Sequence, residues 1–146
     1  MTFKIKNYTT SIPWQKTVME IEYLLAEFGA EAVMKEYRGD GRIESLSFKI
    51  TTKFGVRGFK LPANTESVKM ILTEQKLCPH SKVEEQAEKT AWRIIKDWLH
   101  AQISLVKVGI AEPEQIMLPY MAGDGGKTLY EIIENRQLRI EGDSYD

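Results

Sequence analysis

Large apolar residues near the start of the chain recur at the spacing of one helix face. At intervals of four, three, four and three residues, they are Trp14, Val18, Ile21, Leu25 and Phe28. Pro13 suits the first helical turn because a proline there loses no hydrogen bond. Gly29 readily adopts the left-handed conformation that often ends a helix. The pattern predicts an amphipathic helix between these two positions.

The pattern then changes to the period of β-strands. Residues 32–37 read as a first strand, and Asp40-Gly41 in the next four residues is a favoured hairpin pair. A second, half-buried strand alternates apolar and polar residues, and its apolar members are Leu46, Phe48 and Ile50. After a turn at residues 52–55, one face of a third strand carries Arg57, Phe59 and Leu61. These strands predict an antiparallel meander that ends at Pro62.

Helical spacing returns in the second half of the chain. Asn64 or Thr65 can cap a helix that turns Val68, Ile71 and Leu72 inward. Residues 81–84 have capping-box spacing, with a serine followed three residues later by a glutamate. They open a long helix over residues 82–108. Its predicted apolar arc comprises Ala87, Ala91, Ile94, Ile95, Trp98, Leu99, Gln102, Leu105 and Val106.

Prolines and a second capping box divide the last quarter of the chain. Pro113 suits the start of a short helix, and Pro119 its end. Residues 128–131 have the capping-box pattern, and they open a final helix with Leu129, Ile132 and Ile133 inside. The predicted order is α-β-β-β-α-α-α.

Strands grouped between helices favour the α+β class over a parallel α/β sheet. We predict one domain over residues 1–146, with the meander packed against helices. The expected large core residues are Trp14, Phe28, Phe48, Trp98 and Leu99.

Composition indicates an ordinary folded protein: 42% of the 146 residues are hydrophobic and 28% are charged. The single cysteine, Cys78, excludes an internal disulfide framework. With no apolar run of signal-peptide or membrane-spanning length, the expected location is the cytoplasm. The net charge of −1 gives no general attraction to nucleic acid, so any such function depends on local patches.

One such patch is the sheet set, in which bases and an aromatic residue follow the meander: Lys49, Lys53, Phe54, Arg57 and Lys60. Cations that contact phosphates and rings that stack on bases are typical of single-strand binding proteins. The alternative is a half-buried sheet with Phe48 and Phe59 in the core and its lysines in water.

A second patch is the helix set on the long helix: Lys89, Arg93 and Lys96. If the two sets faced one way, they would form a groove for weak binding of single-stranded nucleic acid. The alternative is a solvated helix face with local pairs such as Glu85 with Lys89.

The sequence contains no assembled catalytic, metal or cofactor motif. Residues 126–128 match the end of a phosphate-binding loop, but Met121 occupies the position where that motif needs a glycine. Cys78, His80 and His100 supply too few ligands at suitable spacing for zinc. Asp97 and His100 can meet on one helix face, but no nucleophile accompanies them. We therefore expect no enzyme, no metal and no cofactor.

Three stretches resemble a family of small, uncharacterised phage and prophage proteins: TFKIKNYTTSIP from Thr2, EQAEKTAWRIIKDWLHAQ from Glu85, and LPYMAGDGGKTLYE from Leu118. The resemblance implies an origin in a mobile element and action in the host cytoplasm. It suggests two partners, single-stranded nucleic acid or a host protein such as a defence factor. For the second, an acidic C-terminal segment that includes Glu141, Asp143 and Asp146 could imitate nucleic acid.

Overall fold

The computed structural model describes residues 3–136. Its elements are α1 (Trp14–Glu27), β1 (Ala32–Tyr37), β2 (Ile43–Thr52), β3 (Gly55–Pro62), α2 (Thr65–Glu74), η1 (His80–Lys82), α3 (Val83–Lys107), α4 (Pro113–Met117), η2 (Leu118–Tyr120), η3 (Asp124–Gly126) and α5 (Leu129–Asn135). The predicted α+β class and the predicted order, a helix, three strands and then helices, are confirmed. Glu141, Asp143 and Asp146 lie outside the described residues.

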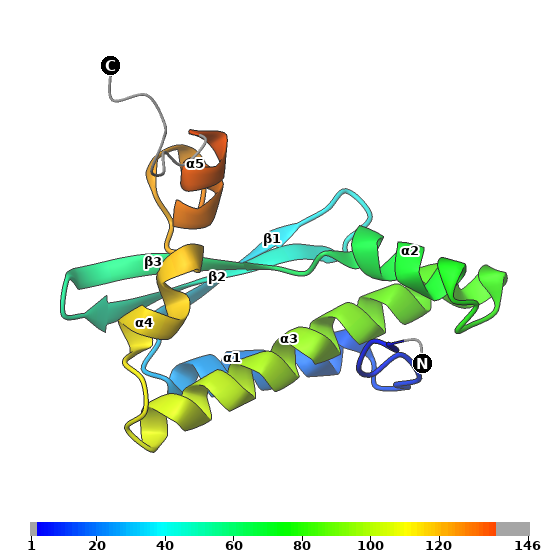
Figure 1. The fold of residues 1–146 in the computed structure, drawn as a ribbon, viewed down its shortest axis with the longest axis horizontal. Helices are drawn as coiled ribbons and strands as arrows, with labels where there is room; N and C mark the ends of the chain where they lie inside the picture. Colours follow the sequence, from blue (N-terminus) through cyan, green and yellow to red (C-terminus); the bar gives the residue numbers. More distant parts are fainter. Residues whose placement is uncertain (1–2, 137–146) are drawn as a thin grey trace.

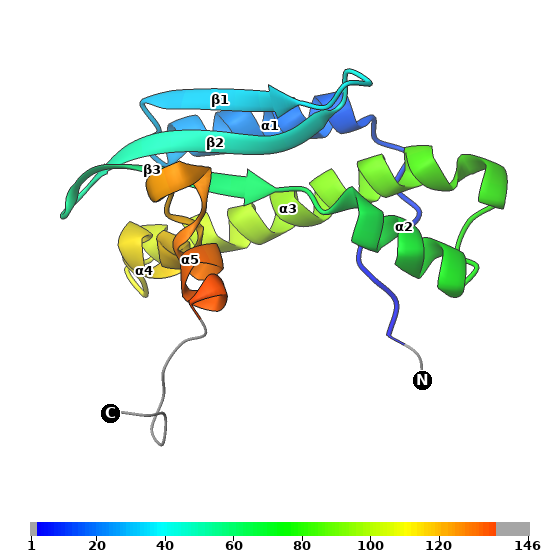
Figure 2. The same ribbon diagram turned by 90° about the horizontal axis from the view of Figure 1, so that it is seen from above.

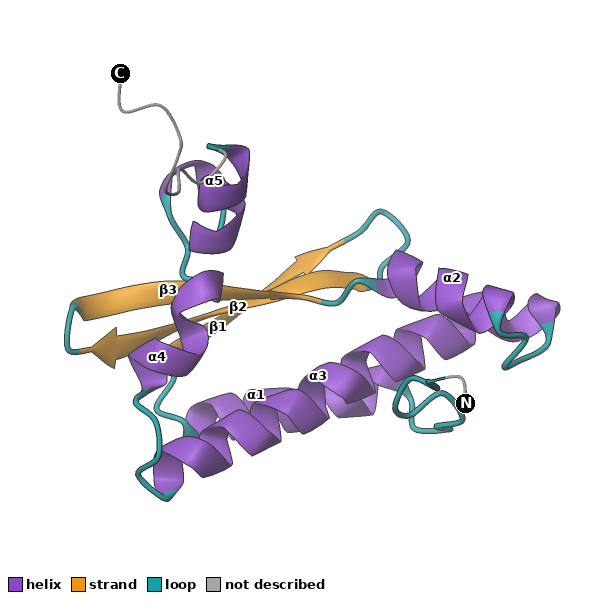
Figure 3. Ribbon diagram, in the orientation of Figure 1, coloured by secondary structure: helices purple, strands orange, loops and turns teal. Residues whose placement is uncertain are grey.

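The three strands form one antiparallel sheet in the order β1-β2-β3. Phe48 at the centre of β2 lies between Val33 of β1 and Phe59 of β3. Helices α1 and α3 lie side by side against one face of this sheet, whereas α5 stands on the other side (Figures 1 and 2). The colouring by secondary structure in Figure 3 shows the resulting layers of sheet and helices.

The core lies between the sheet and the pair of helices. The sheet contributes Leu46, Phe48, Ile50, Phe59 and Leu61, and α1 contributes Val18, Ile21 and Leu25, all of them buried. The predicted face of the first helix and the predicted alternation of β2 are therefore confirmed. Of the five large core residues expected from the sequence, Phe48 and Leu99 are fully buried, whereas Trp14, Phe28 and Trp98 are only partly buried against the core.

The buried face of α3 differs from the predicted arc. Trp92, which the predicted arc left out, is completely buried. Glu88 and Ile103 are buried as well, whereas Ile94 and Leu105 are partly exposed. Ala87, Ala91 and Leu99 of the predicted arc are buried, so the buried face overlaps that arc but extends past it to Trp92 and Ile103.

The helix starts test three capping predictions. Asn64 caps α2, because its side-chain oxygen accepts the N–H of Ser67 at 3.2 Å. The capping box at Thr128 and Glu131 is also confirmed. The box predicted at residues 81–84 is wrong, because a 3₁₀ turn leads into α3 and Lys82, its N-cap, makes no side-chain cap bond.

Helix α5 is less buried than predicted. Leu129 and Ile132 are half-buried, whereas Ile133 is 37% exposed, so the prediction that it lies inside is wrong. None of the helices within residues 3–136 has the length and apolarity needed to cross a membrane.

Candidate functional site

The sheet set is spread over different parts of the sheet. Lys49 is exposed on the face of β2 opposite Phe48, which points into the core. Lys53 and Phe54 form the tip of the β2–β3 turn, and Lys53 Nζ lies 6.0 Å from the centre of the Phe54 ring. Arg57 is exposed opposite Ile50 in the register of the sheet, so it belongs to the helix-facing side at the β3 edge.

Two aromatic residues of the meander are structural. Phe48 and Phe59 lie opposite each other and stack with their ring centres 5.4 Å apart. Both are buried beneath the helices and cannot reach a base. For these two rings, the alternative interpretation of the pattern is correct, and of the three phenylalanines of the meander Phe54 alone is exposed enough to stack on a base.

The helix set lies in the helix layer, where two of its three members pair with α1. Arg93 contacts Glu20 at 2.6 Å and Lys96 lies 3.9 Å from the same carboxylate. Lys49 projects from the opposite side of the sheet, so the two sets do not form the shared groove considered from the sequence. The local pair of Glu85 with Lys89 is also absent among the described residues.

Glu114 of α4 holds the backbone of the turn that carries Lys53 and Phe54. The buried Glu114 carboxylate accepts the backbone N–H of Lys53 at 2.8 Å. This hydrogen bond to the charged form lowers the pKa of Glu114 below its usual value. Both side chains at the tip therefore project from a turn with a fixed backbone.

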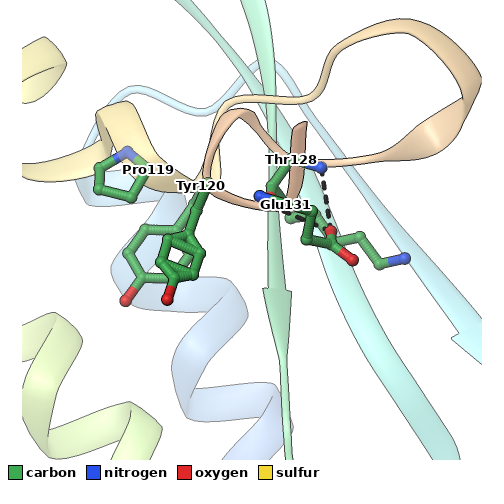
Figure 4. A pocket seen from close by; sticks show the side chains of 6 residues that line it. Pro119, Tyr120, Thr128 and Glu131 are labelled. Carbon is green, nitrogen blue, oxygen red and sulfur yellow. Dashed lines mark hydrogen bonds between the residues drawn. The ribbon is translucent and has the colours of Figure 1, made fainter. Parts of the chain in front are cut away.

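A hollow of about 420 Å³ opens beside β3 on the outer side of the sheet. It is lined by Lys60, Pro119, Tyr120, Thr128, Tyr130 and Glu131. Figure 4 shows Pro119 and Tyr120 on one side of it and Thr128 with Glu131 on the other. The chain after η2 runs along β3 here, since the N–H of Ala122 donates to the carbonyl of Gly58 at 2.7 Å.

A second hollow of about 330 Å³ adjoins the first at Tyr120. Its walls are Leu61, Ile94, Ile95, Trp98 and Tyr120. Trp98 and Tyr120 meet edge to face with ring centres 5.4 Å apart. We call the two hollows together the Tyr120 groove. The two hollows share Tyr120, each also includes a residue of β3, and both have mainly apolar surfaces.

Lys60 is the base at the Tyr120 groove. None of the ion pairs within residues 3–136 involves Lys60, although it is half-buried. The neighbouring Glu131 carboxylate is held by the backbone N–H and the hydroxyl of Thr128. These hydrogen bonds, with smaller contributions from the charges of Lys60 and Lys127, lower the pKa of Glu131.

The Tyr120 groove was not predicted from the sequence. The sequence predicts that Ile94, Ile95 and Trp98 belong to the apolar arc of a buried helix. That prediction does not indicate that these side chains line an open hollow. Tyr120 and Tyr130 come from the irregular last quarter, whose path across the sheet has no signal in the sequence. Lys60 alone was identified, but as a phosphate contact.

The other candidates from the sequence have structural roles. Residues 126–128 lead into the Thr128 cap, as the alternative interpretation expected. Asp97 does not pair with His100 but accepts the side-chain amide of Asn7 at 2.9 Å. Within residues 3–136, no group of three or more potential ligands is placed to hold a metal ion.

No protein-family model, no curated protein and no solved structure matches this chain.

Proposed function

We propose that the chain is a non-catalytic protein-binding module that takes a short segment of a partner protein into the Tyr120 groove. The observation that carries the proposal is the pair of apolar hollows on either side of Tyr120, the larger of which is also lined by Lys60. Concave, mainly apolar sites with a few polar groups are typical of binding sites. The resemblance to phage and prophage proteins favours a host protein as the partner.

The lining of the Tyr120 groove specifies the chemistry of its occupant. Each hollow can accept one large apolar side chain, and aromatic walls such as Trp98, Tyr120 and Tyr130 are typical of residues that dominate binding energy. Lys60 is half-buried and forms no ion pair among the described residues, although its charge acts on Glu131 in the same hollow. The expected occupant therefore carries two large apolar side chains and a nearby carboxylate.

A displayed library of random nine-residue peptides tests this proposal. The wild-type protein should enrich peptides with two large apolar residues and at least one acidic residue. Tyr130→Ala and Lys60→Glu should each weaken the selected peptides about tenfold, which corresponds to roughly 1.4 kcal/mol. Tyr130 is 57% exposed, so its truncation should leave the fold intact.

Two matched variants serve as controls for the peptide experiment. Tyr23→Ala removes a tyrosine that is 66% exposed on α1, and Lys49→Glu reverses an exposed lysine on the same sheet. Neither should change peptide affinity. If no peptide is enriched, or if the selected peptides bind all four variants equally, the Tyr120 groove is not a peptide site.

Weak binding of single-stranded nucleic acid is a second candidate function. It is favoured by the joint exposure of Lys53 and Phe54 at the fixed turn, with Arg57 nearby on β3. A ring that is 55% exposed can stack on a base while the lysine contacts a phosphate. The helix set is not part of this candidate site, because Arg93 and Lys96 already contact Glu20 of α1.

A labelled thymidine oligonucleotide, titrated at several salt concentrations, tests the second candidate. Phe54→Ala should cost roughly 1–3 kcal/mol of binding free energy if the ring stacks on a base. Replacing both Lys53 and Arg57 by alanine should flatten the salt dependence by about 0.7 for each lost phosphate contact. Lys96→Gln, a control on the helix layer, should leave the slope unchanged. Absence of binding at low salt would exclude this function.

A further inference from the structure

A third hollow lies at the other end of the molecule, where three segments meet. It has a volume of about 520 Å³ and a mainly polar lining. Its walls come from the start of α1 (Pro13, Trp14 and Gln15), from the β1–β2 turn (residues 40–42) and from α3 (Glu85, Glu88 and Lys89). We call it the polar hollow. It shares no residue with the Tyr120 groove.

One side of the polar hollow offers hydrogen-bond donors and positive charge. Helix α1 begins after Pro13 without a side-chain cap. Among the described residues, the N–H groups of Trp14 and Gln15 have no acceptor. The first turn of a 14-residue helix carries a partial positive charge, and it attracts anions. Arg42 and Lys89 line the same hollow, and Lys89 forms no ion pair among the described residues, whereas Arg42 lies 3.9 Å from the Glu88 carboxylate.

Glu88 of α3 is one of the residues that line the polar hollow. Glu88 is 2% exposed, and its Oε1 accepts from the guanidinium of Arg38. Its Oε2 is buried and has no hydrogen-bond partner in the described part of the chain. A buried carboxylate oxygen without a donor is costly, so a bound ligand that supplied one would be stabilised there. Because Arg38 already balances the charge of Glu88, a neutral hydroxyl suffices.

The acidic residues around the polar hollow are mostly engaged. Asp40 accepts the backbone N–H of Arg42 at 3.0 Å and lies 3.7 Å from the Nε atom of Arg38. Glu85 is exposed and forms no ion pair among the residues described. Of the three carboxylates in the lining, Glu85 is therefore the one that would repel an anion without a local counter-charge.

We propose that the polar hollow binds a nucleoside monophosphate unit. The phosphate would be bound by the first turn of α1, Arg42 and Lys89. A sugar hydroxyl would donate to Glu88 Oε2, and the base would pack beside Trp14, which is partly exposed and lines the hollow. The same unit occurs in free nucleotides and at the phosphorylated end of an oligonucleotide.

Isothermal titration calorimetry with adenosine 5′-monophosphate tests the proposal on the wild-type chain. The two most informative variants remove a positive and a negative charge, respectively, from the same hollow. Lys89→Gln should weaken binding about five- to tenfold, because a charge-assisted contact with phosphate is lost. Glu85→Gln should strengthen it about two- to threefold, because an uncompensated repulsion is removed. A general loss of structure could not produce opposite signs.

The contribution of Glu88 is tested with the ligand rather than with the protein. Adenosine and inorganic phosphate, each of which supplies only part of the proposed contacts, should bind at least tenfold more weakly than the monophosphate. The 2′,3′-dideoxy monophosphate should lose several-fold, because no sugar hydroxyl remains for Glu88 Oε2. The matched control Lys16→Gln, an exposed lysine in the first turn of α1 outside the lining, should bind like the wild type.

An oligonucleotide with a 5′-phosphate and the same sequence with a 5′-hydroxyl identify the source of the unit. Tighter binding of the phosphorylated oligonucleotide than of the free nucleotide supports the proposal and assigns the site to nucleic-acid ends. The reverse order supports it and assigns the site to free nucleotides. The proposal is overturned if neither ligand binds, or if Lys89→Gln and Glu85→Gln both leave affinity unchanged.

Discussion

Replacement of Trp92 by alanine should lower the free energy of unfolding by about 3–5 kcal/mol, the usual cost of truncating a large buried aromatic residue. The side chain is completely buried in the core between the sheet and the helices. Its removal would forfeit the burial of apolar surface and leave a cavity that the surrounding core residues can fill only in part. Urea denaturation followed by circular dichroism measures the change.

Two further variants make the Trp92 experiment specific. Tyr23→Ala truncates an aromatic residue that is 66% exposed, so it should change stability by less than about 0.5 kcal/mol. Trp92→Phe should cost clearly less than Trp92→Ala, because it keeps an aromatic ring in the core, whereas both changes remove the indole N–H, which has no hydrogen-bond partner in the described part of the chain. Equal losses in Trp92→Ala and Tyr23→Ala would show that α3 does not bury Trp92.

Local patterns were enough to predict the elements of the fold. The period-two alternation around Phe48 identified β2, and the spacing of Val18, Ile21 and Leu25 identified the inner face of α1. These signals succeed because the alternation of a strand and the turn of a helix depend only on near neighbours in sequence. The same holds for the capping box at Thr128, whose two bonds lie within four residues.

The full extent of the buried face of α3 could not be predicted in this way. A choice based on apolar residues alone excludes Glu88 from the buried face. Glu88 is buried because Arg38, fifty positions earlier, reaches it from the β1–β2 turn. Once that contact is known, burial of the adjacent Trp92 and the partial exposure of Ile94 follow from the geometry of the helix.

The candidate sites could not be predicted from the sequence for a related reason. An alternation of basic and aromatic residues occurs in half-buried strands as well as on nucleic-acid-binding surfaces. Phe48 and Phe59 are buried, so here the alternation reflects a half-buried strand. The Tyr120 groove requires α3, β3 and the chain after η2 to meet, and the polar hollow requires three other distant segments. No local sequence pattern indicates that these distant segments come together at either site. Only Lys60 and Lys89 among the binding residues selected from the sequence line these sites.

Arg38 connects three elements, and its replacement by alanine should destabilise the fold by about 3 kcal/mol. Its guanidinium contacts Glu88 of α3 and donates to the hydroxyl of Thr65, the first residue of α2, at 3.0 Å. Burial opposes the charge of Arg38, yet the hydrogen bond and attraction from Glu88 prevail and raise its pKa further. Loss of Arg38 would leave the carboxylate of Glu88, which is 2% exposed, without its counter-charge. Breaking a buried ion pair typically costs roughly 3–5 kcal/mol.

The lower end of that range is expected because Arg42 remains 3.9 Å from the same carboxylate and can take over part of the attraction. A double-mutant cycle measures the free-energy cost of leaving the Glu88 charge unpaired. Adding Glu88→Gln to Arg38→Ala should recover about 1 kcal/mol or more, since the buried group is then neutral. Arg38→Lys should rescue only partly, because one ammonium group cannot reproduce the two directed contacts of the guanidinium. If the double variant is less stable than Arg38→Ala by the full cost of Glu88→Gln alone, the two residues are energetically independent, and the contact does not fix the orientation of α3.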